Sequence, residues 1–333
     1  MLRTYVFTVS VLMPTALRFL WLCSCYAFPM STLPGQGALV VYWIPDVGIG
    51  TDPKDLEHIK VPLIDVLSYR PDVVFLFAST FTRDGKVEVD REIFLQMASA
   101  KKLQERGTKV LMSIVGSGGD SPRFGWDDIT DPIAFAKSVR ADIIDKYGLD
   151  GIDIDDEYGG PPDVQRFMNA VGALRAELPN LLLTKALWRD TVYFKTPVAA
   201  GLPNAGKYLA QLLDFGCTMS YAEYDEQIAA IRSYNQLGLG WNQLLIGVQA
   251  GPKEQPAMTP IDDTYKLAKW SVEPESRTKD IPPIRGMMLF TFSQDIQRFT
   301  FGRQQEKPYP DPDDHLWHRT IGAGLTGQPQ PPH

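Results

Sequence analysis

The chain has few of the residues that build disulfide frameworks, metal centres or nucleic-acid surfaces. It contains 3 cysteines and 4 histidines in 333 residues, and its net charge is −7. Cys23 and Cys25 lie near the N-terminus, which leaves Cys217 alone in the body of the chain, where we expect a small buried apolar residue. Nucleic-acid binding needs basic patches, which this composition disfavours. We therefore expect no nucleic-acid partner, no metal and no other cofactor.

The two ends of the chain differ in composition from the middle. Residues 1–30 are a possible leader, because Arg3 precedes an apolar run over residues 5–13. This run is too interrupted for a membrane span. We expect a secreted protein, and the alternative is a cytoplasmic protein that starts at Met30. Residues 323–333 have the composition of a disordered tail.

Between these ends, short apolar runs alternate with helical patterns such as Arg91–Glu105 and Asp131–Tyr147. Eight such runs separated mostly by helices predict a parallel sheet, and about 290 residues in eight repeats favour a single α/β domain, a (β/α)8 TIM barrel over residues 36–322. A doubly wound open sheet is the alternative, but no Gly-x-Gly-x-x-Gly turn follows the first run. The expected strands are Ala38–Trp43, Val73–Ala78, Val110–Val115, Gly151–Asp155, Leu181–Ala186, Phe215–Ser220, Leu244–Gln249 and Gly286–Phe292.

The most informative segment is residues 149–158, where apolar residues alternate with acids as in a half-buried strand. Asp153, Asp155 and Glu157 would point the same way, about 7 Å apart in sequence order. Three inward carboxylates are costly, and a fold tolerates them when one keeps its proton, as general acid catalysis requires. A calcium loop is disfavoured, because its sixth position needs Gly and here holds Tyr158.

A barrel of this kind places catalytic groups at the C-terminal ends of its strands. Glu157 lies just past the end of the fourth expected strand and would reach the open mouth. Asp155 would lie one layer below Glu157, and Asp153 deeper still. Asp150 and Asp156 alternate to the opposite face, where we expect them to brace the strand and its loop.

At this point the chain resembles the family 18 glycoside hydrolases. The family signature Asp-x-x-Asp-x-Asp-x-Glu is matched by Asp150, Asp153, Asp155 and Glu157. Residues 109–116 are similar to the Ser-x-Gly-Gly region of the family, with Val115 where chitinases usually have Gly. Within the family, residues 147–158 most resemble the endo-β-N-acetylglucosaminidases of the endoglycosidase H type.

The resemblance implies a retaining mechanism in which the 2-acetamido group of the substrate is the nucleophile. Glu157 would be the acid and then the base, Asp155 would orient the acetamido N–H, and Asp153 would set the charge state of Asp155. Tyr221 would donate its hydroxyl to the acetamido carbonyl, although Ala222 follows it where the family often has Asp. The implied substrate is an N-glycan or glycoprotein, cut at its N,N′-diacetylchitobiose core, and we expect a monomer.

Five aromatic residues are candidates for contact with the sugar, and each has a structural alternative. Tyr158 could be a wall of the sugar site or a plain strand-end aromatic. Phe290 and Phe292 lie on the eighth expected strand, where many chitinases place a Trp under the sugar, but Phe in a barrel strand is also a common core residue. Trp43 and Trp188 lie near the ends of the first and fifth expected strands.

Two other functions are kept as alternatives. The first is a chitinase on the same barrel, which is disfavoured by Val115, by the missing Trp on the eighth strand and by a short connection over residues 250–285. The second is a sugar-binding protein that has lost catalysis, which is disfavoured because Glu157 is present.

Overall fold

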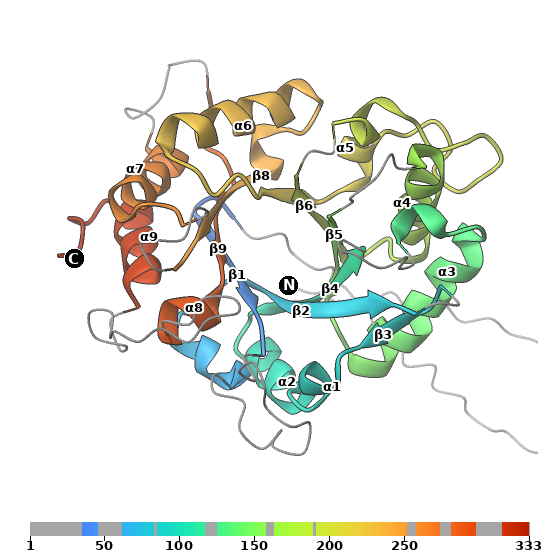
Figure 1. Cartoon of the computed structure of the whole chain (residues 1–333), viewed down its shortest axis with the longest axis horizontal. Helices are drawn as coiled ribbons and strands as arrows, with labels where there is room; N and C mark the ends of the chain where they lie inside the picture. Colours follow the sequence, from blue (N-terminus) through green and yellow to red (C-terminus); the bar gives the residue numbers. More distant parts are fainter. Residues whose placement is uncertain are drawn as a thin grey trace, which may run out of the picture. The chain divides into compact units, whose positions relative to one another are not determined.

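In the part of the chain that the structure describes, eight parallel strands form a ring (Figure 1). The computed structural model describes residues 35–45, 62–82, 85–116, 125–157, 163–188, 191–251, 258–273, 281–297 and 315–332. The strands of the ring are β1 (Ala38–Trp43), β2 (Val73–Phe81), β4 (Lys109–Gly116), β5 (Gly151–Asp156), β6 (Leu182–Leu187), β7 (Phe215–Thr218), β8 (Leu244–Gln249) and β9 (Gly286–Phe290).

The ring closes because β1 pairs in parallel with both of its neighbours. Val40 lies opposite Val73 of β2, and Ala38 lies opposite Gly286 of β9. The remaining neighbours in the ring are also parallel. The predicted (β/α)8 barrel is therefore confirmed.

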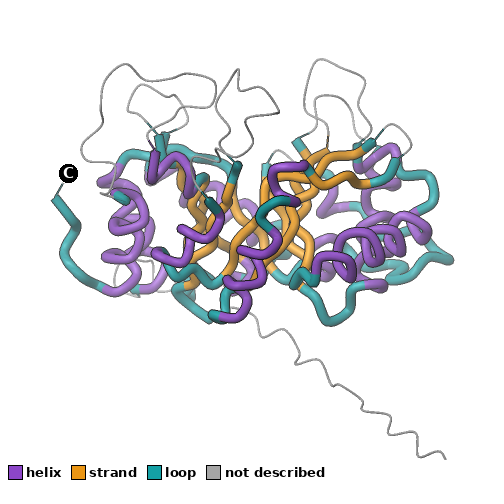
Figure 2. Tube along the Cα trace, turned by 90° about the horizontal axis from the view of Figure 1, so that it is seen from below, coloured by secondary structure: helices purple, strands orange, loops and turns teal. Residues whose placement is uncertain are grey.

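Helices cover the outside of the ring, as the view from the side shows (Figure 2). The α-helices are α1 (Arg91–Phe94), α2 (Met97–Glu105), α3 (Pro132–Val139), α4 (Val164–Glu177), α5 (Leu209–Leu212), α6 (Tyr224–Gln236), α7 (Ile261–Val272), α8 (Phe292–Gln297) and α9 (Leu316–Thr326). Short 3₁₀ turns are η2 (Leu63–Ser68), η3 (Trp126–Asp128), η5 (Tyr193–Lys195) and η6 (Trp241–Gln243), and the π-helical turn η4 (Arg140–Asp145) continues α3.

The elements differ from the sequence-based expectation mainly at their ends. The expected helix Arg91–Glu105 is divided into α1 and α2. Strand β2 runs on to Phe81 and pairs with a short antiparallel strand, β3 (Val87–Val89), which was not predicted. The last strand ends at Phe290 instead of Phe292, because α8 begins there.

Alternation along each strand divides the apolar side chains into an inner and an outer layer. On β1, Val40 and Tyr42 belong to the inner layer, inside the ring, whereas Val41 and Trp43 belong to the outer layer, between the ring and the helices. Cys217 is a fully buried free cysteine of the inner layer, as predicted. The residues of both layers are buried, so polar groups inside the ring need partners.

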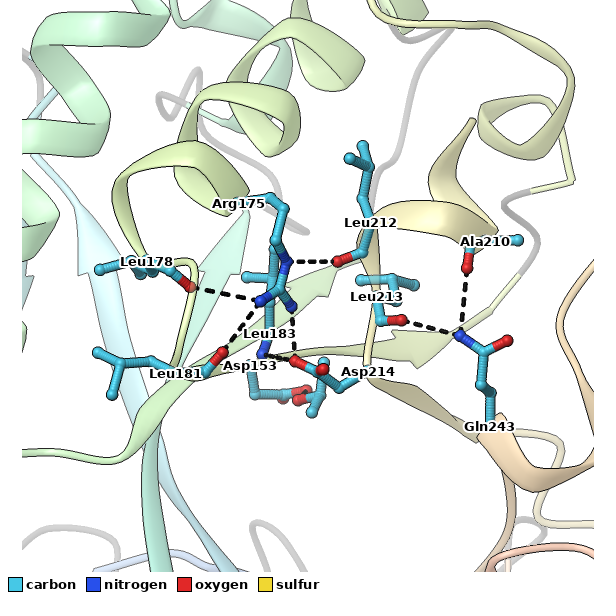
Figure 3. Close-up of polar contacts among 11 residues, drawn as sticks. Asp153, Arg175, Leu178, Leu181, Leu183, Ala210, Leu212, Leu213, Asp214 and Gln243 are labelled. Atoms are coloured by element: carbon cyan, nitrogen blue, oxygen red, sulfur yellow. Dashed lines mark hydrogen bonds and ion pairs between the residues drawn. The ribbon is translucent and has the colours of Figure 1, made fainter. Parts of the chain in front are cut away.

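The N-terminal ends of the strands are held by bonded side chains. Arg175 of α4 donates to Asp214 Oδ2 at 2.5 Å, and Asp214 Oδ2 also accepts the backbone N–H of Leu183 at 2.8 Å (Figure 3). The same guanidinium donates to three backbone carbonyls, those of Leu178, Leu181 and Leu212. This arrangement joins the starts of β6 and β7 to the end of α4.

The C-terminal boundary of the domain differs from the prediction. The tail expected over residues 323–333 begins inside α9, which runs to Thr326 and packs against α7. Further along, Tyr265 donates to the carbonyl of Gln328 at 2.8 Å, so the barrel domain continues past residue 322.

The possible leader, residues 1–30, lies outside the described residues. Among the described helices, none has the length and apolar character needed to cross a membrane.

Candidate active site

Strand β5 carries acidic side chains on both of its faces. Asp153 and Asp155 point into the ring, whereas Ile152, Ile154 and Asp156 point outward. Glu157 follows the strand at its C-terminal end and is half-buried. The order of depth therefore runs from Asp153 to Asp155 to Glu157 toward the mouth.

Asp153 is fully buried and is bonded by three hydroxyl groups from three different strands. Tyr42 Oη donates to Asp153 Oδ2 at 2.7 Å, and Ser113 Oγ donates to the same oxygen at 3.0 Å. Thr184 Oγ1 donates to Asp153 Oδ1 at 2.7 Å. Burial raises the pKa of Asp153, and the three hydroxyl donors act against that rise because they favour the carboxylate. The three hydroxyl bonds thus stabilise the carboxylate form of Asp153 against the effect of burial.

Asp155 lies in the opposite situation. It is 2 % exposed, and among the described residues its Oδ1 atom has no hydrogen-bond partner. Burial raises the pKa of Asp155 well above its ordinary value, and the neighbouring charges of Glu157 and Asp153 raise it further. Both effects favour the protonated form of this carboxyl group when no ligand is bound. An unbonded buried oxygen is rare, which marks it as a site for a ligand group.

Glu157 has the surroundings of a general acid. Burial raises the pKa of Glu157, Lys185 lowers it, and Asp156 raises it. A glutamic acid with a raised pKa keeps its proton closer to neutral pH than an ordinary one. Its place just after β5 leaves it at the end of the barrel where active sites of this fold lie.

Tyr221 follows β7, which is separated from β5 by one strand, β6, and it interacts with the acids of β5. Its backbone has a positive φ of 44°, which is uncommon for a bulky residue. Its hydroxyl is buried and has no partner within the described part of the chain. Burial raises the pKa of Tyr221, and the charges of Asp155 and Glu157 raise it further, so its hydroxyl is a neutral donor.

Aromatic rings form the floor beside these groups. The ring of Phe290 is stacked on Tyr221 with a centroid distance of 5.6 Å, and it meets Tyr42 and Phe77 edge to face at 5.6 and 6.0 Å. Phe290 is half-buried, which leaves part of its ring available to a ligand. Apolar faces of sugars commonly pack on such rings.

The structure brings only some of the predicted aromatic residues to the acids. Trp43 and Phe292 are both 0 % exposed and belong to the outer layer, so we remove them from the proposed sugar site. Trp188 is half-buried just after β6, on the mouth side of the barrel. Tyr158 lies outside the described residues.

Several residues of the site were missed by the sequence analysis. These are the three donors to Asp153, the side chain of Phe77 inside the barrel, and Lys185 on the outer face of β6. The three donors are Tyr42, Ser113 and Thr184. Ser113 and Thr184 could have been found, because each is a polar residue inside an apolar strand.

Asp150 was expected to brace the strand, and this is confirmed by its bonds to Lys109 Nζ at 2.9 Å and the N–H of Val110 at 3.0 Å. Within the described ranges, no group of three or more His, Cys, Asp and Glu side chains could hold a metal ion.

Comparison with known proteins gives matches at the level of both sequence and fold. The family model of Glycosyl hydrolases family 18 matches residues 39–266. A protein of Flavobacterium sp. (strain SK1022) with the name endo-beta-N-acetylglucosaminidase is 29% identical over 167 residues, which are 46% of this chain and 51% of that protein. Endo-beta-N-acetylglucosaminidase F1 of Elizabethkingia meningoseptica is 34% identical over 187 residues, which are 50% of this chain and 53% of that protein. The chain thus spans about half the length of the curated relatives it matches.

Solved structures of chitinases share the fold. A putative chitinase A from Streptomyces coelicolor has a TM-score of 0.63 at 19% identity, and the match covers 87% of this chain and 99% of that one. A family 18 chitinase from Cycas revoluta, in complex with (GlcNAc)3, has a TM-score of 0.59 at 15% identity and covers 86% and 99%. At these identities the likeness concerns the barrel alone.

Proposed function

Because this chain belongs to the glycosyl hydrolases of family 18, we propose that it is an endo-β-N-acetylglucosaminidase that cuts the N,N′-diacetylchitobiose core of N-linked glycans. One observation carries the proposal: among the described residues, the acceptor Asp155 Oδ1 and the donor Tyr221 Oη are both buried without a partner. An acetamido group supplies the matching pair, an N–H donor and a carbonyl acceptor. The names of the two curated relatives support the choice of substrate.

The proposed reaction uses the acetamido group of the substrate as its nucleophile. Its carbonyl oxygen attacks the anomeric carbon while Glu157 gives its proton to the leaving glycosidic oxygen. Asp155 accepts the acetamido N–H and stabilises the positive charge of the oxazolinium ion that forms. Tyr221 donates to the acetamido oxygen and fixes its direction. Glu157 then takes a proton from water, which opens the oxazolinium ion with retention of configuration.

Asp153 acts on this reaction through its neighbour. Three hydroxyl bonds favour the carboxylate form of Asp153, which lies two residues before Asp155 on β5. Two like charges at this spacing disfavour the loss of a proton from Asp155 until a ligand N–H arrives. Asp153 therefore favours the protonated form of Asp155 at rest. The acetamido N–H favours the anionic form in the complex, where the proton of Asp155 has passed to the solvent.

The proposal is tested by incubating the protein with a high-mannose glycopeptide and, separately, with chitin oligomers. Mass spectrometry should find one N-acetylglucosamine left on the asparagine. A bare Asn or Asp at the site would contradict the proposal, and cleavage of chitin oligomers alone would favour a chitinase. Glu157→Gln is the matched control, because losing a general acid costs about 10²–10⁴-fold in rate. Binding without cleavage of either substrate by the wild type would indicate a sugar-binding protein.

A further inference from the structure

Lys185 is a buried lysine on the outer face of the barrel wall, behind the acids. It is 0 % exposed, and on β6 it lies opposite Ile154 of β5, one residue along from the pair formed by Asp153 and Thr184. Its ammonium donates to the carbonyl of Ala186 at 2.9 Å. A buried ammonium is costly unless charges of the opposite sign lie near it.

The two aromatic rings beside Lys185 do not supply this compensation. Phe167 of α4 and Tyr193 of η5 are stacked with centroids 3.9 Å apart and an interplanar angle of 15°. The ammonium is 5.8 Å from both centroids. A point equally distant from two nearly parallel rings lies beside their shared edge, whereas cation–π attraction requires the face of a ring. The rings therefore offset little of the charge of Lys185, and Asp155 and Glu157 interact with it electrostatically.

The carboxylates lie on both sides of the barrel wall. On the outer side, Tyr193 Oη donates to Asp156 Oδ2 at 2.6 Å, so the ring pair beside Lys185 also holds Asp156. Asp156 packs closely on β4, because a Cβ added at Gly116 would lie 2.7 Å from its Oδ1 atom. On the inner side, burial raises the pKa of Asp155 and of Glu157, and Lys185 is a cation that acts against the rise in each.

Lys185 and Asp156, whose side chains point outward from the barrel, therefore shift the pKa values of Asp155 and Glu157 in opposite directions. Lys185 favours the ionised forms of Asp155 and Glu157, and Asp156 disfavours them. Among the described residues, the other titratable groups near this pair come from β5, from β1 and from the segment after β7, and they are Asp153, Tyr42 and Tyr221. Of the lysines in the described part of the chain, Lys185 is the one that is buried.

We propose that Lys185 is a positioning residue that acts through the barrel wall on Asp155 and Glu157 and sets the pH range in which Glu157 keeps its proton while Asp155 can release its own. The inference deepens the proposed function, on which it rests only where activity is measured. Without the ammonium, both carboxyl groups would hold their protons to higher pH. Removal of the charge of Asp156 would have the reverse effect.

The test compares Lys185→Gln, Lys185→Arg and Asp156→Asn with the wild type. Each protein is labelled with ¹³C at its carboxyl groups, and the titrations of Asp155 and Glu157 are followed by NMR, with Asp155→Asn and Glu157→Gln as references for assignment. We expect the Glu157 midpoint to rise by about one pH unit in Lys185→Gln, the scale of one partly buried charge pair. It should stay near the wild-type value in Lys185→Arg and fall in Asp156→Asn.

Two features of this design separate the inference from its alternatives. Opposite shifts in Lys185→Gln and Asp156→Asn cannot come from loosened packing, and Asp156→Asn still tests the inference if Lys185→Gln fails to fold. Unchanged midpoints in a folded variant would overturn the role of Lys185. The titrations need no substrate, so they remain valid if the wild type fails to cut glycans. If it does cut them, the alkaline limb of kcat should move with the Glu157 midpoint.

Discussion

Acidic side chains at the N-terminal ends of the strands accept hydrogen bonds from backbone N–H groups of neighbouring strands. At the C-terminal end of β5, by contrast, Asp155 has an oxygen with no partner among the described residues. Asp72, Asp150 and Asp214 each stand directly before a strand, and each accepts a backbone N–H from the second residue of the neighbouring strand: Leu39, Val110 and Leu183. Lys109 and Arg175 complete two of these sites with a cation. Each bond joins two strands of the ring at its lower edge.

At the other end, Asp155 is buried among like charges, and no described residue bonds its Oδ1 atom. The difference between the two ends is a division of work that this fold commonly shows, with stability at the N-terminal face and chemistry at the C-terminal face. Asp153 lies between them, because it is bonded as fully as the lower acids but within the inner layer of the site.

The largest effect that would sharpen this comparison is expected for Asp155→Asn. Loss of one charge-stabilising group in an active site costs about 10²–10³-fold in turnover, so hydrolysis of a glycopeptide should fall by that factor. The variant should still accept a preformed glycan oxazoline, because that substrate already contains the ring that Asp155 would help to form in the proposed reaction. Chromatography of the products from both substrates measures this. Equal loss with the oxazoline and the glycopeptide would contradict the proposed role.

The lower end of the barrel should respond in stability instead. Arg175→Met would remove the cation from Asp214 and the donor from three carbonyls. The side chains of this pair are 15% and 24% exposed, so we expect a loss of about 3 kcal/mol in the free energy of unfolding, the lower part of the range for buried pairs. Activity per folded molecule should not change.

A matched control for Arg175→Met lies on the same helix. Arg166 pairs with Asp163, and their side chains are 48% and 45% exposed. Exposed pairs contribute little, so Arg166→Met should cost less than about 1 kcal/mol. Urea denaturation of both variants measures the difference. Equal losses of free energy would mean that the bonds of Arg175 at the starts of β6 and β7 contribute no more than a surface ion pair.

The sequence allowed the barrel to be predicted because its strands carry a regular alternation and are separated by helices. The acids of β5 were predictable for the same reason, since a period of two places them on one face. The positions of Trp43 and Phe292 were not recognised. Trp43 follows Tyr42 on the same strand, so only one of the two can face inward, and Phe292 is turned outward because α8 begins at that residue.

Lys185 could not be predicted, because a charged residue in the middle of an apolar strand has no favourable place until the surrounding carboxylates are known. The lower acids carried a signal in the sequence that is visible in retrospect. Asp72, Asp150 and Asp214 each precede an apolar run by one residue, a spacing that repeats at three strand starts.

The pH dependence of stability should also separate the two ends. Burial and the neighbouring carboxylates raise the pKa of folded Asp155 above that in the unfolded chain. The folded state therefore keeps a proton that the unfolded state loses, and stability declines as the pH rises from the ordinary pKa of about 4 toward the folded one. In Asp155→Asn this decline should be smaller, with a higher Tm than the wild type at neutral pH. Asp145→Asn, at an exposed side chain, is the control whose Tm should follow the wild type across pH 4.5–8.

The smallest effect tests whether a hydroxyl inside the ring with a hydrogen-bond partner, that of Tyr42, differs in its role from one without a partner among the described residues, that of Tyr221. Tyr42→Phe removes one of three donors to the buried Asp153, which should cost about 1–3 kcal/mol in the free energy of unfolding, because the acceptor is charged. Tyr221→Phe removes a hydroxyl that has no partner among the described residues, so it should leave that free energy within about 0.5 kcal/mol of the wild type. Turnover should nevertheless fall about tenfold in Tyr221→Phe, because the variant would lose the neutral hydrogen bond that we propose to the acetamido oxygen. Chemical denaturation and glycopeptide kinetics on the two variants measure both quantities. A Tyr221→Phe variant that loses stability and keeps full turnover would show that this hydroxyl supports the fold and does not serve the substrate.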